Sequence, residues 1–426
     1  MKQKIIWNGD VIVVGGGPAG MASAISSARH GAKTLLIERY NCLGGMGTSG
    51  LVYPFMFQHA KERVVKGIFD EIVKRLKNSG GYREEHGYGK FDIEIYKSVL
   101  EEMCIKNKVE LLYQTLVVDV LVKNNKILGV MVENKTGRQM MLGKIIIDAT
   151  GDADIAYKAG VPYKEGREKD GLTQPMTLMF RVGGVKREEV EKYRMKNPLD
   201  HYFQKLMNEA MKNKDLMPIA VDEILFFYYL HKGEVIVNTT RIPGLKGTNA
   251  WDLTKATIEG RKQVMSLIKF FRKYLPGFEN CYLISTGPTI GVRETRRIEG
   301  EYTITEKDIL SCRKFPDVIA CGFYGVDIHK PEDGTTMKPI GLDKSYDIPY
   351  RALIPKKIKN LLVAGRCISS THEAHSAIRI QPQCMAIGQA AGTAAALSLK
   401  AKTIPRKLDI KKLQIALIKD GVYLGK

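Results

Sequence analysis

The stretch DVIVVGGGPAGMASAISSARHGAKTLLIE, Asp10 to Glu38, decides the fold of this chain. It opens with a short β-branched apolar run, Val11–Val14, which is typical of a strand buried on both faces. A glycine-rich turn and an Ala/Ser-rich helical segment follow, and a second apolar run ends at Glu38. This order of strand, turn, helix, strand and acid predicts a dinucleotide-binding unit.

The glycines of the turn have separate expected roles. Gly15 makes the tight turn, Gly17 lets the backbone approach a pyrophosphate, and Gly20 lets the helix pack closely on the strand. The N-terminus of the helix then faces the phosphates with its unpaired N–H groups. Glu38 follows Gly20 by about the twenty residues expected of an acid that binds a ribose.

Length and composition indicate a globular enzyme. With 426 residues, 44% apolar and 26% charged, the chain is long enough for two domains with full cores. No apolar run is long enough to span a bilayer, and the N-terminus shows no signal-peptide core. We therefore expect a cytoplasmic protein without a membrane span.

The net charge and the cysteines indicate which ligands the protein can bind. The net charge of +20 favours an anionic substrate or nonspecific contact with nucleic acid or acidic membranes. The basic residues are spread along the chain without an aromatic platform, which argues against nucleic acid. The seven cysteines are odd in number and form no CxxC pair, so no metal site is predicted.

The rest of the chain predicts an α/β fold with a second domain. A β-meander is expected over 110–132, and Lys144–Ile147 and Asn360–Gly365 read as strands that rejoin the parallel sheet. An Ala/Gly-rich helix is expected over Cys384–Leu399. The expected architecture is a Rossmann-like dinucleotide-binding domain, parallel sheet plus β-meander, with a mixed α+β substrate or cap domain. The boundaries are 1–160 with 347–402 for the first, 161–346 for the cap, and 403–426 for a C-terminal helical tail.

Several motifs together resemble a known family. They are GGGPAG, LGGMGTSGLV, IIDATGDADIAYKAG, GVRETRRIEGEY, IPYRALIP, LLVAGRCISSTHEAHSAIR and MAIGQAAGTAAAL. The chain is similar to the two-domain FAD-dependent oxidoreductases related to fumarate reductase and succinate dehydrogenase flavoproteins. More narrowly, it resembles the uncharacterised bacterial FAD-dependent oxidoreductase family.

The resemblance implies noncovalent FAD, because no histidine stands in the glycine loop where those relatives attach flavin. It also implies adenine contacts through the backbone of Val118, and a polar contact at Arg366, where relatives carry an acid. The implied FAD-binding residues are Gly15, Gly17, Pro18, Ala19, Gly20, Glu38, Arg39, Gly44, Gly45, Met46, Val118, Ala149, Thr150, Gly151, Gly365, Arg366, Cys384 and Met385. The N–H groups of Cys384 and Met385 would open a helix toward the flavin pyrimidine edge.

The same resemblance implies candidates for catalysis. His375 and Arg379 match the histidine and arginine that precede the final helix in fumarate reductase-like proteins, and Glu294–Gly300 resembles their proton-delivering stretch. Arg379 is either a carboxylate clamp or a scaffold ion pair, and each histidine is either an acid/base group or a bracing residue. His329 is expected to approach the flavin from the other domain. The catalytic candidates are Arg293, Arg297, His372, His375 and Arg379.

Three functions follow in order. The first is an FAD-dependent oxidoreductase that transfers a hydride between a small, anionic organic substrate and flavin N5. The second is a flavin-dependent RNA-modifying enzyme, and the third is a nonenzymatic flavin-binding protein. The chain shows one dinucleotide fingerprint, so a separate electron acceptor or donor is expected. The sequence leaves the oligomeric state open.

Overall fold

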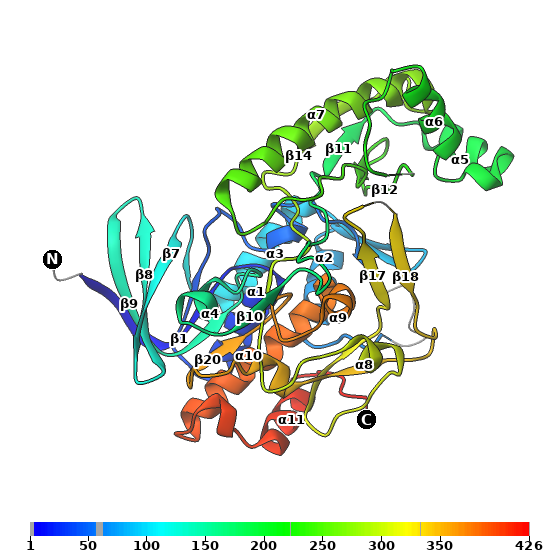
Figure 1. Cartoon of the computed structure of the whole chain (residues 1–426). Helices are drawn as coiled ribbons and strands as arrows, with labels where there is room; N and C mark the ends of the chain where they lie inside the picture. The colour runs from blue at the N-terminus through cyan, green and yellow to red at the C-terminus, as the bar shows by residue number, and fades with distance from the viewer. Residues whose placement is uncertain (1–3, 57–62, 222, 333, 426) are drawn as a thin grey trace.

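A seven-stranded sheet forms the centre of the computed structural model, which describes residues 4–56, 63–221, 223–332 and 334–425 (Figure 1). Its path is β6 (Glu110–Leu112), β2 (Thr34–Ile37), β1 (Ile5–Val14), β9 (Gly137–Asp148), β8 (Lys126–Asn134) and β7 (Leu116–Lys123), and β20 (Leu361–Val363) also pairs with β9. The pairs β1–β2, β1–β9, β2–β6 and β9–β20 are parallel, whereas β7–β8–β9 is an antiparallel meander. The predicted return of a late strand to the N-terminal sheet is confirmed.

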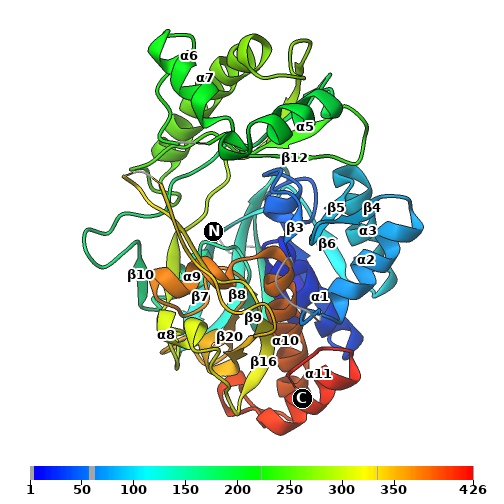
Figure 2. The same ribbon diagram turned by 90° about the vertical axis from the view of Figure 1, so that its right-hand side faces the viewer.

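Two buried helices cross beneath this sheet in close contact (Figure 2). They are α1 (Pro18–Arg29) and α10 (Gln381–Lys400). A Cβ at Gly388 would lie 2.0 Å from the carbonyl oxygen of Ala19, and one at Gly392 would lie 2.1 Å from that of Ser23. These two glycines therefore allow the backbone of α10 to pack directly against the backbone of α1.

A side layer covers the far edge of this domain. It contains α2 (Ile68–Asn78), α3 (Ile93–Lys106) and the small sheet β3 (Phe55–Met56), β5 (Tyr88–Phe91) and β4 (Tyr82–Glu85). Asp92 caps α3 by accepting the N–H groups of Glu94 and Ile95 at 2.9 and 3.0 Å. Helix α2 begins directly after Gly67, whose φ of 73° is not helical.

A separate antiparallel sheet forms the cap (Figures 1 and 2). Its order is β12 (Phe226–Tyr228), β13 (Val235–Val237), β11 (Phe180–Gly183) and β14 (Tyr282–Thr286), and α7 (Ala250–Tyr274) packs along it. Helices α5 (Arg187–Lys196) and α6 (Gln204–Lys212) lie beside it. The apolar residues of this unit, Met176 to Ile290, form their own buried cluster.

Most of the remaining helices and strands contribute side chains to the first hydrophobic core. These remaining elements are α4 (Asp154–Lys158), β10 (Tyr163–Glu165), β15 (Arg296–Ile298), α8 (Glu306–Leu310), β16 (Val318–Gly322), β17 (Val326–His329), β18 (Thr335–Lys338), β19 (Tyr346–Pro349), α9 (His372–Ile378) and α11 (Ile410–Lys419). Buried apolar side chains from 298–346 and from the C-terminal helix join the same cluster as β1 and β9. We therefore propose a cap of 176–290, smaller than the expected 161–346, and a tail that is part of the FAD-binding core.

Candidate functional site

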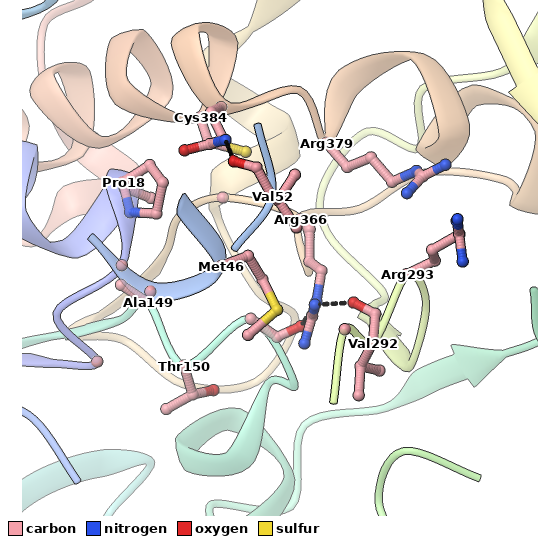
Figure 3. A pocket seen from close by; sticks show the side chains of 18 of the residues that line it. Pro18, Met46, Val52, Ala149, Thr150, Val292, Arg293, Arg366, Arg379 and Cys384 are labelled. Atoms are coloured by element: carbon pink, nitrogen blue, oxygen red, sulfur yellow. Dashed lines mark hydrogen bonds between the residues drawn. The ribbon is translucent and has the colours of Figure 1, made fainter. Parts of the chain in front are cut away.

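A pocket lies at the carboxyl ends of the parallel strands and extends to the cap (Figure 3). Pocket-lining residues Val14, Ala149 and Ala364 follow or end β1, β9 and β20, where ligands of such sheets bind. Fourteen of the expected cofactor residues line it, namely Gly15, Gly17, Pro18, Ala19, Glu38, Arg39, Gly45, Met46, Ala149, Thr150, Gly151, Gly365, Arg366 and Cys384. Residues far apart in sequence thus meet around one elongated cavity.

The acid at the end of β2 braces the nucleotide end of this pocket. The buried Glu38 accepts the N–H of Gly16 at 2.5 Å and that of Tyr40 at 2.8 Å. These two bonds use one lone pair on each carboxylate oxygen and leave the others for a ribose. The side chains of Arg39 and Tyr40 line the same end.

The glycine turn has room where a pyrophosphate would lie. Gly17 is the N-cap of α1 with no side-chain cap, and a Cβ placed on it would have no neighbour closer than Gly45 Cα at 3.9 Å. A Cβ on Gly20 would instead lie 1.7 Å from the carbonyl oxygen of Gly15. Gly17 therefore borders empty space and Gly20 sets helix packing, so the turn fits a dinucleotide.

Four expected cofactor residues do not line the pocket in the described part of the chain. Gly20 and Gly44 are instead required by the backbone. Gly20 allows the close approach to Gly15, and Gly44 adopts a φ of 95° in the left-handed region. Leu116 and Val117 line the pocket, and Val118, the next residue of β7, does not. Met385 is buried one turn into α10.

The start of α10 also corrects an expectation. The helix begins at Gln381 with Pro382 in its first turn, and the N–H of Cys384 donates to the carbonyl of Ile380 at 2.9 Å. That N–H is already part of the helix and is not available to a ligand. The Cys384 side chain still lines the pocket, and burial raises the pKa of its thiol to about 12.

Arg366 forms hydrogen bonds that connect three separate segments of the site. Its guanidinium donates to the carbonyl of Gly151 at 2.7 Å and to Asp152 Oδ1 at 2.5 Å, and it also bonds the carbonyl of Val292 (Figure 3). Arg366, which stands where relatives carry an acid, therefore joins the ends of β9 and β20 to the segment around Val292 that follows the cap.

The cap end of the pocket contains Arg293, which lies far from Pro18 and Ala149 (Figure 3). Its guanidinium donates to the carbonyl of Pro175 at 2.8 Å and also bonds the hydroxyl of Thr177. Burial and then the charges of the neighbouring Arg379 and Arg241 together lower the pKa of Arg293 to about 9. No carboxylate bonds this guanidinium within the described residues, so its charge remains available to a ligand.

Arg379 faces the same end from α9 (Figure 3). Its Nη2 donates to Gln174 Oε1 at 3.2 Å and to the carbonyl oxygen of Asp327 at 3.4 Å. Its Nε is buried without a hydrogen-bond partner in the described structure. An unpaired buried N–H of a guanidinium is costly unless a ligand supplies the acceptor.

His329 lies beside these arginines, as expected, on β17. Its Nδ1 is 3.0 Å from Arg241 Nη2, and because a guanidinium only donates, Nδ1 is the acceptor and the proton of the neutral ring is on Nε2. Burial and then Arg293, Arg379 and Arg241 hold the pKa of His329 well below its usual value. The His329 ring is therefore neutral, and its Nε2, which carries the proton, lies 3.6 Å from Asp327 Oδ1.

Two of the catalytic candidates are bound to Glu294 and lie outside the pocket lining. The buried Glu294 accepts from His372 Nδ1 at 2.8 Å and forms an ion pair with Arg297. Arg297 also donates to the carbonyls of Ser370 at 3.1 Å and Gly166 at 2.8 Å. Both side chains thus bind protein partners away from the described pocket lining, which favours a structural role over the expected catalytic one.

His375 is also outside the pocket lining. It is 1% exposed, and both ring nitrogens are without hydrogen-bond partners among the described residues. Burial and then the charges of Arg297, Arg379, Arg366 and His372 hold its pKa well below the usual value. The ring is therefore neutral and does not line the described pocket, and its role as an acid or base stays a prediction.

Replacing Glu294 by glutamine is expected to destabilise the protein by about 3 kcal/mol, because it leaves Arg297 buried without a counter-charge. The midpoint of guanidinium chloride unfolding measures the loss. Glu299→Gln is the matched control, since Glu299 pairs with the half-exposed Lys356 and should cost less than about 1 kcal/mol. Equal midpoints for the two variants would contradict the buried network.

Sequence reasoning missed most cap-side residues of the pocket. They are Thr177, Met179, Asn238, Gly291 and Val292, together with Asp327 and Gln381. Only Gly291 and Val292 stand in one of the quoted motifs, GVRETRRIEGEY, and the residues come from five separate segments of the chain. The only local signal was the run of polar residues Asn238–Arg241 at the end of an apolar strand, which the sequence alone left without a role.

A Rossmann-like sheet, a dinucleotide turn and a long pocket that ends in arginines define a dinucleotide-dependent oxidoreductase. The chain belongs to the family described as FAD dependent oxidoreductase, whose model matches residues 10–417. The protein is therefore an FAD-dependent oxidoreductase, and FAD is the cofactor that the pocket fits.

Curated relatives match part of the chain. Thiamine thiazole synthase of Sulfolobus acidocaldarius is 32% identical over 162 residues, which are 35% of this chain and 58% of the relative. The tRNA uridine 5-carboxymethylaminomethyl modification enzyme MnmG 1 of Fusobacterium nucleatum is 30% identical over 220 residues, or 44% of this chain and 33% of that enzyme. The chain thus spans less than two thirds of the length of each of these relatives.

Two solved enzyme structures are similar in fold over nearly the whole chain. L-proline dehydrogenase from P. horikoshii has a TM-score of 0.44 at 13% identity and covers 99% of both chains. p-Nitrophenol 4-monooxygenase PnpA from Pseudomonas putida has a TM-score of 0.49 at 11% identity, with 97% of this chain and 85% of that chain covered.

Two searches of the described residues were negative. None of their helices combines the length and the apolar character that crossing a bilayer requires. Nor do three or more of their His, Cys, Asp and Glu side chains gather as a possible metal site.

Proposed function

We propose that this enzyme transfers a hydride between a small anionic organic substrate and flavin N5. The observation that carries the proposal is the excess of positive charge at the cap end of the pocket. Arg293 and Arg379 line it, Arg241 lies next to them, and Asp327 is the one carboxylate lining this end among the described residues. A partly buried site with this imbalance favours an anion.

The chain's own residues have distinct proposed roles. Arg379 and Arg293 hold a carboxylate or similar anion, and the unpaired Nε–H of Arg379 is the strongest open donor. The Nε2–H of His329 donates to a substrate oxygen without changing charge, because Arg241 fixes the tautomer. When bound, FAD supplies the hydride chemistry.

The proposed chemistry differs from that of fumarate reductase-like proteins in one respect. Their proton-delivering arginine matches Arg297 here, and Arg297 is held by Glu294 and two backbone carbonyls. The scaffold resemblance therefore does not extend to that proton path, and the substrate class is anionic in general rather than dicarboxylate in particular. We also propose a separate electron donor or acceptor, since the sequence has a single dinucleotide fingerprint.

A panel of candidate substrates tests this function. Purified holoenzyme is mixed anaerobically with 2-hydroxy acids, amino acids and their neutral amide or alcohol counterparts, and the loss of flavin absorbance near 450 nm, roughly where oxidised flavins absorb, is followed. In parallel, the dithionite-reduced enzyme is offered unsaturated or oxo acids. Reaction with acids and none with their neutral counterparts is expected. Turnover of the neutral compounds alone would contradict the proposal.

A second candidate, an RNA-modifying flavoenzyme, is supported by one comparison and one property of the chain. The match to the tRNA-modifying enzyme of Fusobacterium nucleatum and the net charge of +20 both point that way. A gel mobility shift with total tRNA separates the two proposals. Binding that survives about 200 mM salt would favour RNA, because nonspecific phosphate contacts weaken steeply over that range.

A further inference from the structure

The helix α7 of the cap presents an apolar stripe to solvent. Trp251, Ile258 and Met265 are 78%, 50% and 54% exposed. They are seven residues apart, about two helical turns, and so lie one above another along the helix. The opposite face of α7 is buried in the cap core through residues such as Val264 and Phe271.

Basic side chains flank this stripe on both sides. With 3.6 residues per turn, Lys255 and Lys262 fall on one side of the stripe and Arg261 on the other, and Lys269 continues the stripe toward the C-terminal end. All four are exposed, and none forms an ion pair with a carboxylate in the part of the chain that the structure describes. The surface therefore combines unpaired positive charge with exposed apolar area.

We propose that this face of α7 binds an anionic lipid surface, with the stripe in the headgroup region. An interfacial helix buries large apolar side chains at the headgroup boundary and keeps its lysines and arginines at the phosphates. Tryptophan prefers that boundary, and the long basic side chains extend past the stripe to reach it. The charge of the face complements that of acidic lipids.

Two other occupants fit the face less well. In a symmetric dimer the same face meets itself, so the basic residues of one copy, Lys255, Lys262 and Lys269 among them, would face the basic residues of the other. A coiled coil also needs an apolar residue between successive stripe positions, and the chain has Thr254 and Arg261 there. Nucleic acid would use the basic residues and leave Ile258 and Met265 in water.

The position of α7 gives the surface a clear approach. The helix lies at the outer end of the cap, and α11 lies at the opposite end of the molecule (Figures 1 and 2). Helix α11 also carries exposed apolar and basic residues, including Ile415, Ile418 and Lys419. It is therefore a matched control surface on the far side of the protein.

Vesicle binding by the full-length holoenzyme tests the proposal. The protein is expected to co-sediment with phosphatidylglycerol vesicles and not with phosphatidylcholine vesicles. The double variant Ile258→Glu and Met265→Glu should weaken the binding at least about tenfold, since each substitution removes an inserted apolar side chain. The double variant Ile415→Glu and Ile418→Glu on α11 should bind as the wild type does.

Tryptophan fluorescence provides a second readout at the proposed contact. The chain has two tryptophans, and Trp7 is 8% exposed, so Trp7→Phe leaves Trp251 as the single reporter. Its emission should shift to the blue on adding phosphatidylglycerol vesicles. No co-sedimentation or no shift would overturn the proposal. The proposal would also be overturned if the α7 double variant abolished a dimer or a complex with RNA and left vesicle binding unchanged.

Discussion

A Gly17→Val variant is expected to fold and to purify without colour. Valine is sterically compatible with the backbone of Gly17, whose φ of −67° and ψ of −175° are ordinary for any residue. Its side chain would extend into the open space that borders the pocket. There it displaces the pyrophosphate from the first N–H groups of α1. Losing one or two charge-assisted hydrogen bonds costs about 3 kcal/mol, so the FAD dissociation constant should rise about a hundredfold.

Reconstitution of apoprotein with FAD, followed by quenching of flavin fluorescence, measures this dissociation constant. Gly20→Val is the contrasting variant, because its side chain would collide with the carbonyl of Gly15 inside the protein and should prevent folding. Gly341→Val is the neutral control, since its nearest neighbour is the flexible Lys344 side chain. A yellow Gly17→Val protein with wild-type affinity would exclude Gly17 from the pyrophosphate site.

The Arg293→Met and Arg379→Met variants should lose affinity for anions while keeping their stability. Hydrogen bonds to charged groups contribute about 1.5–3 kcal/mol each, so each variant should bind a carboxylate about 10- to 100-fold more weakly. Because the two guanidiniums repel each other, and Arg241 adds to the repulsion at Arg293, removing one also relieves like-charge repulsion in the folded state. The titration of the flavin absorption spectrum with acetate and benzoate reports the binding.

Arg297→Met is the matched control for these two variants. Arg297 stands four residues after Arg293, but it pairs with the buried Glu294 and does not line the pocket. Its removal should cost about 3–5 kcal/mol of stability and leave anion affinity almost unchanged. If Arg293→Met unfolds as readily as Arg297→Met and binds carboxylates like the wild type, Arg293 is part of the scaffold and the proposed anion site is wrong.

The parts of the fold that local patterns specify were predictable. Helices α3 (Ile93–Lys106) and α11 (Ile410–Lys419) each combine an apolar face with a capping aspartate, which is the kind of local pattern that predicts a helix. Strand β9 was not predictable in full, since it begins at Gly137 instead of Lys144. Its first half pairs with β8, and that pairing adds order where the chain carries the polar residues Arg138 and Gln139.

The nucleotide half of the site was predictable for the same reason, since its turn, helix and acid lie within thirty residues. The substrate half depends on contacts between distant segments. Whether Arg293 or Arg297 faces the pocket is decided by Glu294, which is 0% exposed and binds Arg297 instead. Sequence spacing alone contains no signal for that choice, because all three residues stand in one charged stretch.

The pairing of β20 with β9 has a consequence for biosynthesis. The ribosome adds 213 residues between Asp148 and Leu361, which takes about 10–40 s at ~5–20 residues per second. During that interval the nascent chain exposes the edge of its isoleucine-rich strand and the uncovered surface of α1. We expect chaperones to hold the emerging protein at this stage, and premature termination before Leu361 to leave fragments that aggregate or are degraded.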